Sequence, residues 1–188
     1  MQVTGEKRQK LKELLLKLSY EKKEVILASG RKSDFYFDGK QTSLNPEGAT
    51  LLGILLMEKI RESFPEAGAI GGPTLGADPL VSAVALTSQL QGHPLPAFII
   101  RKEPKGHGTQ SWIEGFKNLS KGMKVVILED VVTTGGSSLT AVRKAEEAGL
   151  KVLGVLAVVD RQEGGREAIE KGGLHFQTLF TKSELLDS

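Results

Sequence analysis

The sequence has no cysteine and few aromatic residues, which make up only 5% of its 188 residues. Without cysteine the chain can form no disulfide, no thiolate zinc site and no cysteine nucleophile. Its three histidines, His93, His107 and His175, lie far apart and do not have the spacing of metal ligands. We therefore expect no metal site built from protein side chains.

Long hydrophobic runs are also missing. The longest mainly apolar segment, residues 152–159, is far too short to span a bilayer, and the charged N-terminus lacks the apolar core of a signal peptide. The 25 basic and 23 acidic residues give a net charge of +2, which gives no argument for a nucleic-acid or membrane partner. These features predict a single cytoplasmic domain, residues 1–188, with no nucleic-acid or membrane partner.

Hydrophobic periodicity alternates between helices and strands along the chain, which predicts an α/β fold with a mainly parallel sheet. An apolar stripe of leucines predicts a first helix, and Asn45-Pro46-Glu47 is a typical start of another. The expected helices are 5–19, 47–63, 78–90 and 164–172, and the expected strands include 95–100, 152–159 and 174–180.

Residues 125–139 have the strongest functional pattern. Four apolar residues, Val125 to Leu128, predict a buried strand that ends at two acids, and a turn of threonines, glycines and serine then leads into a helix with Gly149 at its end. Glycine backbone and the free N–H groups of a helix start suit a phosphate. The turn lacks the lysine of a GxxxxGK[ST] loop, and the chain has no GxGxxG fingerprint, which argues against the common nucleotide-binding loops.

The two acids, Glu129 and Asp130, are unusual beside a phosphate site because they would repel a polyphosphate. They suit sugar hydroxyls or a metal ion, while the threonines and glycines hold one phosphate. Ribose 5-phosphate has this layout. The structural alternative is a polar strand end followed by a capped helix.

Two acids, two hydrophobic residues and then TTGGS closely resemble the phosphoribosyl pyrophosphate (PRPP) motif of type I phosphoribosyltransferases. The resemblance implies a central, mainly parallel sheet flanked by helices, with a small N-terminal hood. It also implies that the acids hold the ribose hydroxyls and that residues 133–137 hold the 5′-phosphate. The residues of this stretch expected to bind PRPP are Glu129, Asp130, Val131, Val132, Thr133, Thr134, Gly135, Gly136 and Ser137.

Residues 25–40 predict a hairpin with three adjacent aromatic residues. The alternatives are core packing of Phe35 and Phe37, or a shelf for a planar base beside Arg31 and Lys32. The segment SGRKSDFYFDGK resembles the N-terminal segment of orotate phosphoribosyltransferases, which implies that Tyr36 and Phe37 bind orotate. We expect the hood to come largely from residues 20–40, with a contribution from residues 174–188.

Residues 101–115 form an unusually long connection, rich in cations and glycines. A solvated basic loop is the alternative to a binding loop. RKEPKGHG resembles the mobile catalytic loop of orotate phosphoribosyltransferases. The resemblance implies PRPP contacts from Arg101, Lys102, Lys105 and His107, a catalytic group of Lys105, His107 and Asp130, and a homodimer in which the loop reaches the neighbour's site. Trp112, Ile113 and Phe116 are candidate anchors of its far end.

Two further segments complete the expected site. Residues 69–80 predict a strand and a second glycine-rich turn into a helix, for which composition allows a plain turn or an anion site. The resemblance implies the pyrophosphate loop of the family. DRQE resembles the segment whose arginine binds the orotate carboxylate, so Arg161 and Thr133 are expected to bind orotate; a surface ion pair is the alternative for Arg161. Some family members carry lysines where this chain has Ala28 and Leu75, and contacts of those lysines cannot be transferred.

Taken together, these motifs, which follow the family's order along the chain, predict an enzyme that transfers ribose 5-phosphate from PRPP to orotate. The products would be orotidine 5′-monophosphate and pyrophosphate, a step of pyrimidine biosynthesis, with Mg²⁺ bound mainly through PRPP and water. The alternatives are a phosphoribosyltransferase for another base and a non-catalytic regulator that senses PRPP.

Overall fold

A six-stranded sheet organises the fold. The computed structural model describes residues 2–26, 32–104 and 112–187. The strand order is β5-β4-β3-β6-β7-β8, and all neighbouring strands are parallel except the antiparallel pair β4 and β5. The strands are β3 (Ala69–Pro73), β4 (Ala97–Ile100), β5 (Ile113–Glu114), β6 (Lys124–Val132), β7 (Lys151–Asp160) and β8 (His175–Thr181). The predicted α/β class with a mainly parallel sheet is confirmed.

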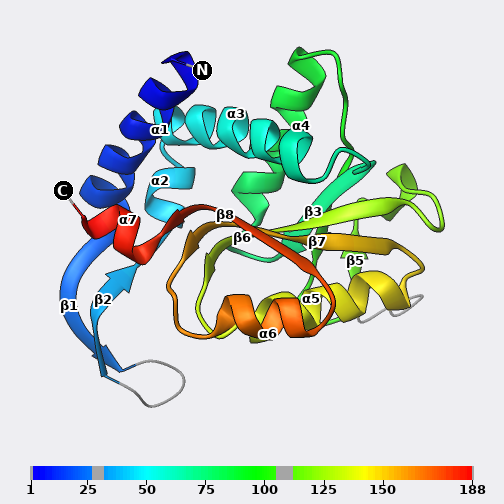
Figure 1. Cartoon of the computed structure of the whole chain (residues 1–188). Helices are drawn as coiled ribbons and strands as arrows, with labels where there is room; N and C mark the ends of the chain where they lie inside the picture. Colours follow the sequence, from blue (N-terminus) through cyan, green and yellow to red (C-terminus); the bar gives the residue numbers. More distant parts are fainter. Residues whose placement is uncertain (1, 27–31, 105–111, 188) are drawn as a thin grey trace.

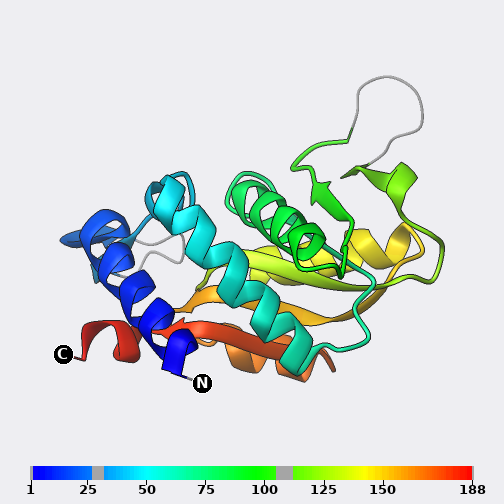
Figure 2. The same ribbon diagram turned by 90° about the horizontal axis from the view of Figure 1, so that it is seen from above.

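Helices cover both faces of this sheet (Figure 1). One face carries α3 (Pro46–Ser63) and α4 (Asp78–Leu90), and the other carries α5 (Gly136–Glu147) and α6 (Gly165–Lys171). Figure 2 shows α1, α3 and α4 arranged side by side over the strands. Each face has its own apolar core, and β6 contributes to both, with Val126 and Leu128 on one side and Val125 and Ile127 on the other. None of the helices in the described part of the chain has the length and apolar character needed to cross a bilayer.

Local sequence explains the helix ends. The Asn45 side chain accepts hydrogen bonds from the N–H groups of Glu47 and Gly48, and Pro46 occupies the first turn, as predicted for α3. Gly149, with φ of +87°, follows the last turn of α5 in the left-handed conformation expected of a C-terminal glycine. The first helix differs from expectation: α1 (Gln2–Leu14) continues as a π-helical turn, Leu15–Ser19.

A separate two-stranded hairpin forms the expected N-terminal hood. It pairs β1 (Tyr20–Ile26) with β2 (Lys32–Phe37), so it begins five residues earlier than Val25. Alternation along β2 puts the Phe35 and Phe37 rings together in the core, with centroids 5.9 Å apart, and leaves Tyr36 38% exposed. A short helix, α2 (Lys40–Ser43), then connects the hairpin to α3.

Two expectations about strands are wrong. β6 does not end at Leu128, because its pairing with β7 continues through Glu129 and Val131. Residues 174–180 do not join the hood: they lie almost entirely in β8, whose backbone pairs with β7 at the edge of the central sheet. Only the following helix, α7 (Lys182–Leu186), reaches the hairpin, where the Lys182 ammonium lies 5.1 Å from the centroid of the Phe35 ring.

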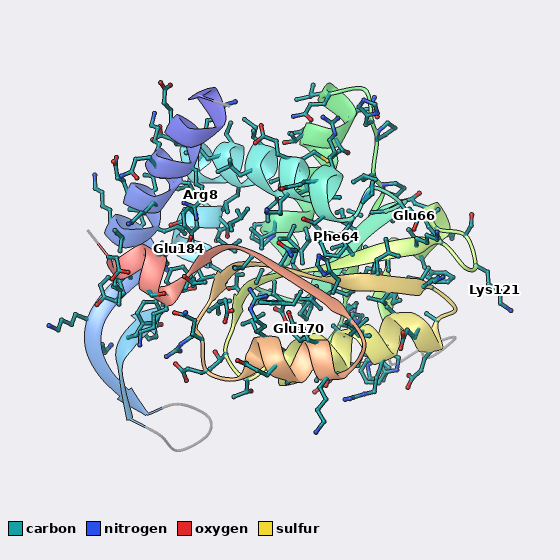
Figure 3. The ribbon with its side chains drawn as sticks, viewed as in Figure 1. Arg8, Phe64, Glu66, Lys121, Glu170 and Glu184 are labelled. Carbon is teal, nitrogen blue, oxygen red and sulfur yellow. The ribbon has the colours of Figure 1, made fainter. Side chains whose placement is uncertain are left out.

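Two arginines contact the backbone and the rings of β8 from the helices beside it. Arg8 of α1 donates to the Leu179 carbonyl at 3.0 Å and lies over the Phe180 ring. Arg166 of α6 donates to the Phe176 carbonyl at 3.5 Å and lies over the Phe176 ring. Figure 3 shows Arg8 pointing toward Glu184 of α7, with which it forms an ion pair of 3.0 Å, so the two ends of the chain are joined here.

Candidate functional site

Glu129 lies near the end of β6 and is almost completely buried, with 4% of its surface exposed. The hydroxyls of Ser137 and Ser138, in the first turn of α5, both donate to its Oε1 atom at 2.9 Å. Burial raises the pKa of Glu129 to about 7; the two hydroxyl donors oppose this shift, and the charge of Asp130 adds to it. A carboxylate is therefore held beside the start of the helix at a large desolvation cost.

Asp130 lies where three segments of the chain meet. Its Oδ1 atom accepts a hydrogen bond of 2.9 Å from the N–H of Val131. A Cβ atom added to Gly76 would come within 2.5 Å of Oδ1, and one added to Gly39 within 3.0 Å of the Asp130 Cβ. Burial raises the pKa of Asp130, while the Val131 N–H and the charge of Lys40 lower it. The turn after β3, the turn after β2 and the end of β6 thus converge on one carboxylate.

Lys40 is a site residue that the sequence analysis missed. Its ammonium forms a 2.6 Å ion pair with Asp38, and its positive charge lowers the pKa of Asp130. The pair raises the pKa of Lys40, through the hydrogen bond to Asp38 first. The DGK sequence directly after the aromatic segment was the available signal, but nothing in its spacing pointed to Asp130.

The turn between β6 and α5 has the geometry expected of an anion site. Gly135 has φ of +80°, a left-handed conformation that favours glycine, and no side chain caps the helix start. A Cβ atom on Gly136 would meet nothing closer than the Thr134 hydroxyl at 4.0 Å, so the backbone faces open space. The turn therefore leaves room for a ligand against the first N–H groups of α5.

Arg161, the predicted carboxylate ligand, lies close to this turn and is 8% exposed. Its N–H donates to the carbonyl of Val132 at 2.9 Å, next to Thr133. Its guanidinium donates to the Phe35 carbonyl at 3.1 Å, pairs with Glu163 at 3.0 Å and lies 5.3 Å from the centroid of the Phe35 ring. The structure thus brings together the hood, the DRQE segment and the start of the central turn.

The two predicted aromatic ligands occupy opposite faces of the hairpin. The Phe37 ring is 8% exposed and stacks on Phe35, so it is a core side chain rather than an open shelf. The Tyr36 ring is on the exposed face, 5.3 Å from the ammonium of Lys23. Core packing was therefore the better interpretation of the Phe37 ring, while the position of its main chain beside Asp38 remains close to the site.

The two ends of the long connection, Arg101 and Trp112, lie next to β4 and β5. The N–H of Arg101 donates to the Trp112 carbonyl at 2.8 Å, and its guanidinium pairs with Glu114 at 2.9 Å. Lys144 of α5 donates to the Arg101 carbonyl at 3.0 Å, and its ammonium is 3.6 Å from the Trp112 ring centroid. Burial lowers the pKa of Lys144.

Of the predicted anchors, Ile113 is 4% exposed and the partly buried Trp112 packs against the core, whereas Phe116 is exposed. Lys102 is exposed beside Arg101. The predicted residues that lie outside the described part of the chain are Lys105, His107, Arg31 and Ala28.

The second glycine-rich turn follows β3. The Thr74 hydroxyl donates to Oδ2 of Asp78, in the first turn of α4, at 2.7 Å. The peptide bond between Thr74 and Leu75 is cis, and Leu75 is 64% exposed. A hollow of about 560 Å³ lies between this turn and the start of the long connection. Its lining residues are Thr74, Asp78, Ile99, Arg101, Lys102, Glu103 and Glu114.

Comparison with known proteins gives one consistent result. Residues 54–176 match the model of the phosphoribosyl transferase domain family. The chain is 50% identical over 179 residues to an orotate phosphoribosyltransferase of Sorangium cellulosum, covering 95% of this chain and 93% of that protein. It is 51% identical over 160 residues to the orotate phosphoribosyltransferase of Aquifex aeolicus, covering 85% of each.

Solved structures agree with these sequence matches. A crystal structure of Mycobacterium tuberculosis orotate phosphoribosyltransferase with Fe(III) dicitrate superposes with a TM-score of 0.82 at 38% identity, covering 96% of this chain and 99% of that one. The structure of the same enzyme with PRPP gives a TM-score of 0.77 at 36% identity, covering 95% and 98%. The similarity therefore includes both the sheet and its N-terminal hairpin.

Proposed function

The chain belongs to the orotate phosphoribosyltransferase family, and on that premise we propose that it transfers ribose 5-phosphate from PRPP to orotate. N1 of orotate would form a bond to C1 of the ribose as the bond from C1 to the pyrophosphate oxygen breaks. The products are orotidine 5′-monophosphate and pyrophosphate, as in pyrimidine biosynthesis. Orotate arrives as an anion through its carboxylate, and the proton on N1 leaves as the new bond forms; the departing pyrophosphate can accept it, so the reaction requires no strong general base from the protein.

One observation carries this proposal: an acid pair, an open helix start and a buried arginine lie around the same end of the sheet. Glu129 and Asp130 end β6, Gly136 leaves space at α5, and Arg161 bonds to the carbonyl just before Thr133. Ligand contacts in open α/β sheets cluster at the carboxyl ends of the strands. The ribose 5-phosphate would lie between the two acids and the helix start.

The proposed roles divide along the ribose. The N–H groups and hydroxyls of residues 133–137 would bind the 5′-phosphate, because a helix start favours an anion. Asp130 and Glu129 would accept hydrogen bonds from the ribose hydroxyls, directly or through water. The positions of Val131 and Val132 in β6 support these contacts by fixing the strand end against β7.

Orotate would bind at the hood end of the site. Its carboxylate suits the guanidinium of Arg161, which contacts the hood at the Phe35 carbonyl, and Thr133 and the main chain of Tyr36 and Phe37 would border the ring. The nearly buried Arg161–Glu163 pair supports this role, because a substrate carboxylate can share a guanidinium that is already desolvated.

Pyrophosphate would leave toward Arg101 and Lys102, at the start of the long connection. Charge builds on it in the transition state, and cations placed there give the largest electrostatic benefit. Arg101 and Lys102 border the hollow beside Thr74, and Lys105 and His107 complete the proposed cationic set. We assign catalytic roles to Lys105, His107 and Asp130.

Mg²⁺ fits this site as a companion of the substrate. Among the residues that the structure describes, no group of three or more acids or histidines could hold a metal ion. The oxygens of PRPP and water would therefore hold it, with the Asp130 carboxylate able to accept hydrogen bonds from those waters. The ion supplies positive charge for the pyrophosphate.

The assembly proposed for the enzyme is a homodimer in which the loop of residues 101–115 serves the neighbouring site. The exposure of Leu86 and Leu90 supports a partner surface along α4. Analytical ultracentrifugation tests this state: a single monomeric species at micromolar concentration would contradict it.

A coupled measurement tests the activity. The protein is mixed with PRPP, Mg²⁺ and orotate, and the loss of orotate absorbance is followed with release of pyrophosphate. We expect turnover with orotate and none with adenine or hypoxanthine. Turnover with a purine alone would indicate another base, and PRPP binding without turnover would indicate a regulator.

A further inference from the structure

The hydroxyls of Ser137 and Ser138 both bind Glu129, but they differ in their access to a ligand. Ser137 is exposed at the first turn of α5, whereas Ser138 is completely buried at 0% exposure. Both hydroxyls nevertheless donate to the same atom, Oε1, at 2.9 Å. A ligand phosphate at the helix start can reach Ser137 but cannot reach Ser138.

The second carboxylate oxygen of Glu129 is in a different situation. In the part of the chain that the structure describes, Oε2 accepts no hydrogen bond from another residue, and it is not among the fully enclosed polar atoms without a partner. It is therefore the atom that remains for a ribose hydroxyl. The orientation of Oε2 depends on what holds Oε1.

We propose that Ser138 is the positioning residue for Glu129: it alone holds Oε1 when the 5′-phosphate of PRPP takes the Ser137 hydroxyl, and so keeps Oε2 directed at the ribose. The inference rests on the proposed function, because it assigns the phosphate to the helix start. A hydroxyl has one proton to donate, so Ser137 cannot serve the phosphate and Glu129 at once. Without Ser138, the arrival of the phosphate would leave the Oε1 atom of a buried carboxylate with no hydroxyl donor.

The surroundings of Glu129 make this donor important. The charged group that acts on Glu129 is its neighbour in β6, Asp130, whose negative charge disfavours ionisation of Glu129. Asp130 in turn faces Lys40 and Asp38. The strand opposite contributes Ala157 from β7, and the first turn of α5 carries no acid. The hydroxyl donors are therefore the main local groups that favour the ionised carboxylate over the neutral acid.

The test uses the pH dependence of kcat/KM for PRPP in the full-length enzyme. In Ser138→Ala, the acidic limb of this pH profile should move to higher pH by about one unit, because a hydrogen bond to a charged group shifts its pKa by about this amount. Most of the activity should return at pH values above the limb. Ser138→Cys, which keeps the volume but donates weakly, should shift the limb in the same direction. A limb that coincides with that of the wild type in both variants would overturn the proposal.

Ser88→Ala is the matched control. Ser88 is also completely buried, and its hydroxyl donates to the Ala85 carbonyl at 2.7 Å and accepts from the Leu95 N–H at 2.9 Å, away from the site. It should lower the melting temperature without moving the limb. An equal shift in Ser88→Ala would show that the limb reports stability and would refute the positioning role.

Carboxyl ¹³C chemical shifts then separate the two serines. Without ligand, Ser137→Ala and Ser138→Ala should both raise the pKa of Glu129. With ribose 5-phosphate bound, only Ser138→Ala should raise it; an equal effect of Ser137→Ala would show that Ser137 never leaves Glu129. A wild type that turns over no orotate defeats the proposed function, whereas an active wild type with unshifted variants defeats this inference alone.

Discussion

The two glycine-rich turns at the carboxyl ends of β6 and β3 look alike in sequence but use glycine for opposite reasons. After β6, Gly135 supplies a left-handed φ and Gly136 faces open space. At β3, a Cβ atom on Gly71 or Gly72 would lie 2.3 Å from Phe98 or from the Leu128 carbonyl, and one on Gly76 within 2.5 Å of Asp130. The first turn is shaped for a ligand, and the second is shaped for the protein itself.

This difference gives the two turns different tolerances. A side chain added at Gly136 competes with a bound phosphate and leaves the empty protein intact, whereas one added at Gly135 would meet the Gly165 carbonyl at 3.0 Å. A side chain added to the turn after β3 displaces atoms of the folded protein, including the carboxylate of Asp130. Composition alone cannot distinguish the two cases, because both turns read as glycine between a strand and a helix.

The largest expected effect concerns the buried charge of the first turn. The folded-state pKa of Glu129, about 7, is above its usual 4.5, so the wild type loses stability as the pH rises from about 4.5 to about 7. Glu129→Gln removes that penalty and should stabilise the protein at pH 8 by on the order of 3 kcal/mol, with little gain at pH 4.5. It should lower kcat/KM for PRPP. Denaturant unfolding at both pH values measures the gain.

Glu62→Gln is the control for this prediction, since the Glu62 side chain is 70% exposed and pairs with Lys59. It should give no comparable gain at pH 8. A pH-independent effect of Glu129→Gln would contradict the raised pKa.

The second prediction contrasts glycines of the two turns. Gly76→Ala should push Asp130 from its position and reduce kcat/KM by about 100-fold, the usual cost of misplacing a catalytic group by about 1 Å. Gly136→Ala should fold normally, because its Cβ atom meets no close neighbour, and should mainly raise the KM for PRPP. Steady-state kinetics and melting curves of the two variants give the comparison, and identical kinetic patterns would refute it.

The third prediction concerns α5. This helix begins at the proposed phosphate-binding turn, and its Lys144 contacts Arg101 and Trp112 at the two ends of the long connection. Lys144→Met keeps most of the apolar stem but removes the donor to the Arg101 carbonyl and the cation over Trp112. We expect kcat to fall about fivefold, with the KM for orotate unchanged. Lys59→Met, on the far side of the sheet, is the control. A change confined to the KM for orotate would argue against this link.

The smallest effect is expected at Leu75, in the turn after β3. This residue is 64% exposed and occupies a position where some family members carry lysine. Leu75→Lys should cost no stability and lower the KM for PRPP about two- to fivefold, the scale of an exposed ion pair. The gain should disappear in 0.5 M salt because of screening. A gain that persists at high salt would have another origin.

Much of this arrangement could be predicted because the signals are local. The bounds of α4, the cap at Asn45 and the terminal Gly149 follow from caps and periodicity, and all three agree with the structure. The resemblance of residues 125–139 also identified the central turn. These features depend on neighbours within a few residues along the chain.

The failures share a cause in contacts between distant segments. β6 continues through two acids because backbone pairing with β7 outweighs the polarity of Glu129 and Asp130. Residues 174–180 join the central sheet because β7 offers an unpaired edge, which no local pattern reveals. The approach of Lys40 to Asp130 depends likewise on where the hairpin docks.

The guarded edge of the central sheet has a consequence for the behaviour of the protein in concentrated solution. An open edge strand can template a strand from another molecule, which is a common route to fibrils. Along β8 the guanidinium groups of Arg8 and Arg166 already occupy the carbonyls of Leu179 and Phe176. The opposite edge, β5, has only two residues. Charged side chains beside one edge strand and the short length of the other are features that disfavour pairing with a strand of another molecule.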